Sequence, residues 1–416
     1  MTLPARHAII PNIVEQHAEE AAFLWLLRDA ATDEPHYDRQ DLARLDERVE
    51  AHLDGLRVAR RDGFEIALSM LQANEETGEL FAASVLALES GERSLIELLE
   101  AIAEANFEAR PGFIGAIGWP PAGKLRATVK DWLESPLAFG RFLGLSACSW
   151  HRADLGQKFP NYLNDPEPLV RASAFRLAGE VGRADLAPTL ERSLEDEDDE
   201  ARFWAAWSLA LLGAGTAAAH VLQAHAEARG PHTGHALQAA VRAMSPAASR
   251  DWLRQLNGDH AQARLVIQGM GVLGDPQAVP WLIGRMSDPD LARVAGESFS
   301  MITGVDLAYD DLESDGPEGF EAGPSPDPAD ANVALDPDEN LPWPEPDLIE
   351  QWWQENRERF PAGQRYLLGR TLDEDACHHA WNAGFQRQRR AAAYNLAFGS
   401  AESRLENWRL PRYAIR

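Results

Sequence analysis

Apolar residues follow a helical spacing that repeats along the middle of the chain. In one block they lie three or four positions apart, as one face of an α-helix requires, and a shift of 31 residues finds apolar or small residues again. The two sets are Val170, Ala174, Leu177, Ala178 and Val181, and Ala201, Ala205, Ser208, Leu209 and Leu212. We expect these positions to face inward.

The repeated unit also ends at regular intervals. Successive blocks end at Gly182, Gly213, Met244, Gly274 and Gly304, at steps of 31, 31, 30 and 30 residues. A glycine there is expected to end the helix, because it alone enters the left-handed conformation without steric cost. Weaker copies end near Gly91, Trp119 and His151. The period predicts an all-α protein, an α-solenoid of about seven helix pairs that bury their apolar faces by stacking.

The segments outside the period define four predicted regions. Residues 1–76 are expected to form a helical N-terminal cap, 77–304 the repeat solenoid, 305–347 an acidic, proline-rich insert or linker, and 348–416 a helical C-terminal cap with a tail. In the N-terminal cap, Ile13, Ala18, Ala21, Leu24, Trp25 and Leu27 are expected to be the apolar face of the first helix, and Leu42, Leu45, Val49, Leu53, Leu56 and Val58 that of the second. In the tail, Leu405, Trp408, Leu410 and Tyr413 are expected to dock back onto the C-terminal cap.

The insert has an unusual composition. Residues 305–347 contain fourteen Asp or Glu, eight prolines and no Lys or Arg. One interpretation is a solvated, mobile spacer, since such a segment buries too little apolar surface to offset its ordering entropy. The alternative is that the insert lies across the basic end, because residues 357–416 hold eleven Arg against six Asp or Glu.

The repeat resembles a known family. Asp165, Val170, Arg171, Ala174 and the Gly182 turn, followed by Leu186, Pro188, Leu190 and Leu194, are similar to a HEAT-like repeat of the short type also found in phycobilisome-lyase-like proteins. The whole chain further resembles a proteobacterial family of HEAT-like proteins that often accompany type VI secretion effector and spike loci. This resemblance implies an adaptor or chaperone role.

Charge and composition exclude several classes of function. Lys and Arg number 39 against 66 Asp and Glu, a formal charge of -27, so a nucleic acid would be repelled at long range. The two cysteines, Cys148 and Cys377, have no CxxC spacing and predict neither a disulfide framework nor a zinc site. No apolar run reaches the length of a membrane span, and the first residues lack a secretory signal. We therefore expect a cytoplasmic protein with no nucleic-acid or membrane partner.

Catalytic chemistry has little support in the sequence. Cys377, His378 and His379 are the only clustered soft ligands, and adjacent helical residues point about 100° apart, so no metal site is expected. No phosphate-binding loop and no GxSxG turn are present. We expect no cofactor, no metal and no catalytic residue.

Tryptophans at non-core repeat positions are the candidate partner-binding residues. Trp207 aligns with Arg176, Gln238, Gln268 and Ser298, so it is expected to face away from the apolar seam; the Trp204 series is more mixed. Trp352 and Trp353 are adjacent, so one of them points off the buried side of its helix. Exposed aromatic side chains are frequent binding hot spots, although each of these four can instead pack on a neighbouring helix. As a hot spot, Trp207→Ala is expected to weaken partner capture without lowering the melting temperature.

These observations predict a non-enzymatic scaffold or adaptor that binds a protein, with a type VI secretion effector as the partner that the resemblance implies. The alternative is a bilin-lyase-like or other enzyme built on the same repeats, which requires polar groups converging in a cavity.

Overall fold

The computed structural model describes residues 9–320, 322–324, 335–400 and 403–415. Contacts divide the chain into two compact units, one of Met1–Asp33, Tyr37–Val181 and Asn407–Arg416, and a second of Glu34–His36 and Gly182–Glu406. Within the described ranges, regular structure is almost entirely helical, and the strands are only two residues long. The predicted all-α solenoid class is confirmed.

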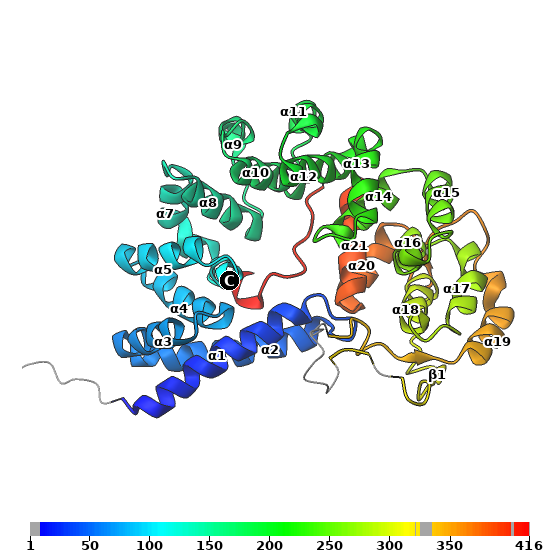
Figure 1. Ribbon diagram of the computed structural model, residues 1–416, viewed down its shortest axis with the longest axis horizontal. Helices are drawn as coiled ribbons and strands as arrows, with labels where there is room; N and C mark the ends of the chain where they lie inside the picture. Colours follow the sequence, from blue (N-terminus) through cyan, green and yellow to red (C-terminus); the bar gives the residue numbers. More distant parts are fainter. Residues whose placement is uncertain (1–8, 321, 325–334, 401–402, 416) are drawn as a thin grey trace, which may run out of the picture. The chain divides into compact units, whose positions relative to one another are not determined.

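The first unit is built from consecutive helices (Figure 1). They are α1 (Pro11–Ala31), α2 (Arg39–Ala59), α3 (Arg61–Asn74), α4 (Thr77–Ser90), α5 (Arg93–Ala105), α6 (Arg110–Ile117), α7 (Ala122–Leu133), α8 (Ala138–Trp150), η1 (Gly156–Lys158), α9 (Phe159–Leu163) and α10 (Pro168–Glu180), with η8 (Arg412–Ile415) near the chain end. The indole of Trp25 on α1 stacks on Phe81 of α4 at 4.5 Å, and Trp119 meets the Phe81 ring edge-on at 5.2 Å. The N-terminal helices thus share one core with the helices that follow.

Most of the predicted apolar face of α1 and α2 is buried, but three positions are not. Ile13 is 48% exposed, Leu27 41% and Val58 78%, so the prediction that they face the core is wrong. At Leu27, the neighbouring Arg28 takes the interior position instead. Its guanidinium is buried against Asp46 of α2, with Nε and Oδ1 2.8 Å apart.

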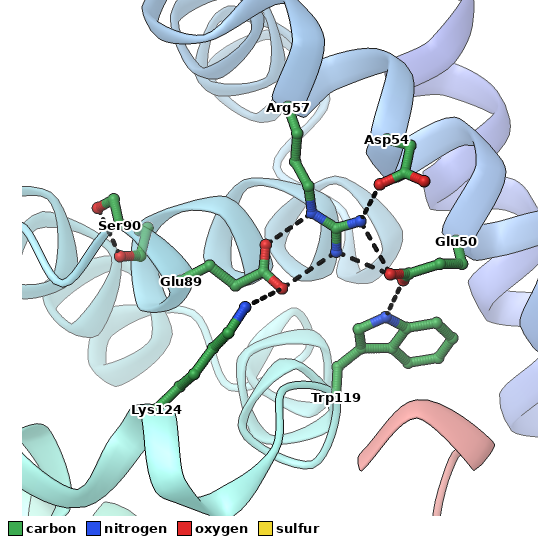
Figure 2. Close-up of polar contacts among 8 residues, drawn as sticks. Glu50, Asp54, Arg57, Glu89, Ser90, Trp119 and Lys124 are labelled. Carbon is green, nitrogen blue, oxygen red and sulfur yellow. Dashed lines mark hydrogen bonds and ion pairs between the residues drawn. The ribbon is translucent and has the colours of Figure 1, made fainter. Parts of the chain in front are cut away.

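A polar network joins α2 to the helices beyond it (Figure 2). Arg57 donates from Nε to Glu89 of α4 at 2.7 Å and from Nη1 to Glu50 at 2.9 Å, and the Trp119 indole N–H donates to Glu50 at 2.8 Å. Lys124 of α7 lies 3.9 Å from Glu89. Burial acts to lower the pKa of Arg57, but the hydrogen bonds to the two glutamates outweigh it and raise the pKa. The guanidinium therefore stays charged and holds the two helices together.

The C-terminal tail belongs to this first unit. Asn407 donates to the carbonyl of Trp150 at 2.9 Å, Arg409 pairs with Asp29 at 2.8 Å, and the backbone N–H of Arg412 donates to the second oxygen of Asp46 at 2.8 Å. Trp408 is buried as well. The prediction that the tail docks onto the C-terminal helices is therefore wrong for residues 407–414, because their polar partners lie on α1, α2 and α8.

The second unit continues with shorter helices. They are η2 (Ala184–Leu186), α11 (Ala187–Arg192), η3 (Ser193–Glu195), α12 (Asp199–Leu209), the π-helical turn η4 (Ala210–Ala214), α13 (Gly215–Glu227), α14 (Thr233–Ala243), α15 (Pro246–Leu256), η5 (His260–Gln262), α16 (Ala263–Leu273), η6 (Pro276–Ala278), α17 (Val279–Arg285), α18 (Ala292–Thr303), α19 (Pro346–Asn356), η7 (Arg357–Arg359), α20 (Glu374–Ala383) and α21 (Gln386–Gly399). Two small antiparallel hairpins pair β1 (Glu313–Ser314) with β2 (Trp343–Pro344) and β3 (Tyr366–Leu367) with β4 (Arg370–Thr371).

The repeat positions behave as the period predicts. The ten residues expected to face inward are all buried, from Val170 through Leu212. The expected helix-ending glycines adopt the left-handed conformation, with φ of 73° at Gly182, 82° at Gly213, 71° at Gly274 and 75° at Gly304.

The β3–β4 hairpin covers the ends of two repeat helices. The N–H of Tyr366 donates to the carbonyl of Gly274, just after α16, at 2.7 Å, and the N–H of Leu368 donates to Met301 of α18 at 2.8 Å. A side chain at Gly274 would place its Cβ 2.3 Å from the Tyr366 oxygen. The helix-ending glycine is thus also required for this close backbone contact.

The described part of the acidic insert is held against repeat helices. Asp338 is buried and forms a two-point ion pair with Arg264 of α16, and Asp336 lies 2.6 Å from Arg293 of α18. The basic end contributes Arg387, which donates to the carbonyl of Pro337 at 3.4 Å. The ion-pair partners of Asp336 and Asp338 are therefore in the repeats, while the basic end adds the contact of Arg387 with Pro337. Residues 325–334 lie outside the described ranges.

One helical stretch in the described residues, Asp199–Glu227, is long and apolar enough to cross a membrane by length and composition. However, 61% of its most apolar window is buried inside the protein, and Gly213 breaks its helical path. Buried core helices pass the same test, so the stretch is weak evidence for a membrane span.

Candidate functional site

Trp207 is a core residue of the second unit. Its side chain is 1% exposed, so the prediction that it faces away from the apolar seam is wrong. The indole N–H donates to the hydroxyl of Tyr394 on α21 at 3.1 Å, and that hydroxyl lies 2.7 Å from Nδ1 of His235. Because an indole N–H only donates, the hydroxyl accepts from Trp207. Helix α21 therefore covers the position that the repeat alignment left open.

Trp204 is buried in the same cluster. Its side chain is 6% exposed and donates to Glu200 at 2.6 Å, and its ring meets that of Trp207 edge-on at 5.2 Å. His232 stacks on Phe203 beside it at 4.2 Å. An exposed hot spot at Trp204 or Trp207 is incompatible with this burial.

The tryptophan pair of α19 is also turned toward the protein. Trp353 is buried at 6% exposure, with its ring 5.6 Å from Phe360. Trp352 is half-buried and its ring meets Phe299 of α18 edge-on at 5.6 Å. The structure therefore does not bring the four tryptophans together on an exposed ridge.

A pocket of about 900 Å³ lies where α14, α20 and α21 meet the segment before β3. We call it the arginine pocket. Its lining residues are Arg242, Arg365, Leu372, Asp373, Glu374, Cys377, His378, Asn395, Leu396, Phe398, Gly399, Ser400, Ser403, Arg404 and Glu406. Figure 1 shows α21 beside α14 and α20 in this unit. The pocket combines buried cations with apolar and carboxylate groups, the composition of a specific binding site.

Arg242 of α14 is the most buried cation in the pocket, at 9% exposure. Its guanidinium donates to the Asn395 side chain at 2.7 Å, to the backbone and side-chain oxygens of Gln238 at 3.0 and 2.6 Å, and to the carbonyl of Ala391 at 3.3 Å. All of these acceptors are neutral. Burial, reinforced by the neighbouring Arg365, lowers the pKa of Arg242 to about 9, so the group is still charged at pH 7.

Arg365 is the second cation. It donates from Nε to the carbonyl of Leu273 at 2.7 Å and from Nη2 to that of Val272 at 3.4 Å. These carbonyls end α16, where a positive charge is favourable. Burial also lowers the pKa of Arg365. Among the described residues, no carboxylate lies within ion-pair distance of either guanidinium.

In two other pockets of this unit, an arginine is paired with a carboxylate. In a smaller one of about 190 Å³, Arg250 is paired with Asp275 at 2.5 Å. In another, Arg293 is paired with Asp336. Buried arginines are normally neutralised in this way, because an unpaired buried charge is costly. The arginine pocket is different, because neither buried Arg242 nor half-buried Arg365 has a carboxylate within ion-pair distance among the described residues.

Cys377 lines the same pocket from α20. Burial raises the pKa of its thiol to about 11, so the thiolate is scarce at neutral pH and the group is a poor nucleophile. Across the ranges that the structure covers, no group of three or more His, Cys, Asp or Glu side chains is placed to hold a metal ion.

Sequence reasoning missed the arginine pocket for a definite reason. Arg242 lies inside a repeat helix as one more polar residue, and its partners Ala391 and Asn395 come about 150 residues later. A usable signal was present in the arginine itself, since the preceding repeat block has Leu211 where this block has Arg242.

Comparison with protein families identifies HEAT repeats at residues 158–242. Comparison with curated protein sequences gives no match. The family match and the helical repeats around it support a HEAT-like repeat protein.

Proposed function

We propose that this HEAT-like repeat protein is a non-enzymatic scaffold that binds a partner protein, and that the arginine pocket is one of the places where the partner is held. HEAT repeats generally mediate protein–protein interaction, and repeat proteins of this kind use extended faces for it. The single observation that supports this pocket is the pair of guanidiniums of buried Arg242 and half-buried Arg365, neither of which has a carboxylate within ion-pair distance among the described residues.

The enzyme alternative required polar groups converging in a cavity, and the arginine pocket supplies such groups. The raised pKa of the Cys377 thiol disfavours nucleophilic attack by that group at neutral pH. We therefore favour binding over catalysis. The cytoplasm as the place of action is part of this proposal.

A narrower proposal follows from the family resemblance, in which the partner is a type VI secretion effector and the protein is its chaperone or adaptor. Its support is the resemblance of the repeats and terminal helices, and it predicts that the captured partner is encoded near a secretion locus.

The test is affinity capture of the tagged full chain from its native host, followed by mass spectrometry. Arg242→Gln removes a pocket charge, and Arg192→Gln removes an exposed arginine of α11 as the matched control. The captured protein is then purified, and its complex with each variant is measured by size-exclusion chromatography.

We expect one protein to bind the wild type and the control and to be lost with Arg242→Gln. A partner that binds all three equally would overturn the role of the pocket. Capture of no protein, or of a bound pigment instead, would overturn the scaffold proposal.

A further inference from the structure

The arginine pocket has unused hydrogen-bond donors. A guanidinium carries five N–H groups. Arg242 directs four of them to Asn395, Gln238 and Ala391, and Arg365 directs two to the ends of α16. Four N–H groups of the two arginines are therefore without an acceptor among the described residues. These N–H groups belong to two arginines that line the same pocket, and the charge of Arg365 helps to lower the pKa of Arg242.

Two neighbouring guanidiniums with spare donors favour an anionic ligand. Each guanidinium repels the other, and a carboxylate between them would relieve that repulsion and accept the spare hydrogens. The nearby acidic residues do not play this part. Asp373 accepts the N–H of Ala376 at the start of α20, and Glu374 lies 3.5 Å from His378.

The remaining lining limits the charge of the ligand. Asp373, Glu374 and Glu406 line the pocket together with the three arginines Arg242, Arg365 and Arg404. The formal charges of these six residues cancel, so the lining does not favour a group with several negative charges. The chain as a whole carries -27, which adds long-range repulsion of polyanions. Leu372, Leu396 and Phe398 provide apolar surface beside the arginines. The lining thus matches one carboxylate attached to an apolar body.

We propose that the arginine pocket binds a single carboxylate of a peptide, held between Arg242 and Arg365, with the adjoining apolar side chain against Leu372, Leu396 and Phe398. The carboxylate comes from a chain end or from an acidic side chain. This inference rests on the proposed function, since it names the chemical group by which a partner protein is held.

The probes are small molecules that isolate this chemistry, applied to the full chain. N-acetyl-leucine carries a terminal carboxylate beside an apolar side chain, N-acetyl-leucinamide is its neutral match, and N-acetyl-glutamic acid amide carries the carboxylate on the side chain. Ligand-observed NMR measures their dissociation constants, which we expect in the millimolar range for fragments of this size. Inorganic phosphate is the fourth probe.

The first two probes test the carboxylate itself. N-acetyl-leucine is expected to bind at least about ten-fold more tightly than its amide, because a charged carboxylate accepts stronger hydrogen bonds from guanidinium groups than a neutral amide does. Equal binding of the two would overturn the proposal. Saturation by phosphate without binding of N-acetyl-leucine or the glutamic acid probe would overturn it as well. The stronger of the two carboxylate probes shows whether the group is a chain end or a side chain.

The variants test whether the carboxylate probe binds in the arginine pocket. Arg242→Gln and Arg365→Gln are each expected to weaken the carboxylate probe about ten-fold or more, and Arg192→Gln is expected to leave it unchanged. Thermal melting checks that each variant is folded. If Arg242→Gln does not fold, Arg365→Gln is the variant that tests the pocket. Unchanged binding in both folded pocket variants would overturn the inference. Because these probes need no partner, their failure is distinct from failure of protein capture.

Discussion

The indole of Trp207 donates a hydrogen bond to the hydroxyl of Tyr394, 187 residues later in the chain, at 3.1 Å. Both side chains are almost completely buried. The bond therefore joins a repeat helix, α12, to the C-terminal helix α21. It makes the stability of the second unit depend on both segments.

Trp207→Ala is expected to destabilise the second unit strongly. Removing a buried tryptophan leaves a large cavity and costs about 3–5 kcal/mol, which corresponds to a fall in melting temperature of about 10 °C for a unit of this size. Trp207→Phe keeps most of the packing and loses mainly the hydrogen bond to Tyr394, so about 1 kcal/mol is expected. Calorimetric melting of both variants checks the order. An unchanged melting temperature for the alanine variant would show that Trp207 is not a core residue.

Asp46→Ala is expected to destabilise the first unit by about 3–5 kcal/mol, because it leaves the buried guanidinium of Arg28 without its counter-charge. The substitution also removes the acceptor for the N–H of Arg412, so the tail is loosened. Urea unfolding followed by circular dichroism measures the loss. Glu65→Ala is the control, since its pair with Arg61 is exposed to solvent and contributes little to stability. Similar losses for both variants would contradict the special role of the buried pair.

The fold could be predicted where it depends on local pattern. Helical spacing placed Val170 and Ala201 in the core, and the period placed the left-handed turns at Gly182 and Gly213. The prediction from the repeat alignment was wrong at Trp207. The equivalent positions of other repeats are polar or small and suggested an exposed position, but in this repeat α21 covers it. Contacts between distant segments leave no periodic trace.

The same limit applies to the candidate site. The buried charge of Arg242 depends on Asn395, and nothing near either residue in the sequence shows that the two are partners. In the insert, the charge pattern suggested a position across the basic end, but Asp338 pairs with Arg264 of a repeat helix. Composition shows that charges need partners, and only the folded chain shows which ones.

His151 is expected to make the first unit less stable in weak acid. Burial lowers the pKa of His151 below 6.5, although the hydrogen bond to the carbonyl of Ile117 acts in the opposite direction. As the pH falls, His151 of the unfolded chain therefore takes up a proton near pH 6.5, whereas His151 of the folded chain takes it up at a lower pH. The stability contributed by the neutral side chain is present above about pH 6.5 and is lost as the pH falls through the folded pKa.

The measurement is the free energy of unfolding at pH 7.5 and 5.5 for the wild type and His151→Gln. The variant is expected to lose less stability over this interval, because glutamine does not titrate. His260→Gln, at an exposed position of η5, is the control and should follow the wild type. If His151→Gln keeps the full pH dependence, the acid sensitivity arises elsewhere.

Gly274→Ala is expected to cost at least about 2 kcal/mol and to loosen the β3–β4 hairpin. The position has φ of +71°, which is unfavourable by about 1–2 kcal/mol for a residue with a side chain. The new Cβ would also lie 2.3 Å from the carbonyl oxygen of Tyr366, so the hairpin must move away from the end of α16.

Gly284 offers a matched control, since a Cβ there meets no atom within 4 Å. Gly284→Ala in α17 is expected to be neutral or slightly stabilising, because alanine is the better helix former. Hydrogen exchange resolves the two effects: exchange at Tyr366 and Leu368 should accelerate in Gly274→Ala and stay unchanged in Gly284→Ala. Protection of these two amides in both variants would show that the hairpin does not depend on the glycine turn.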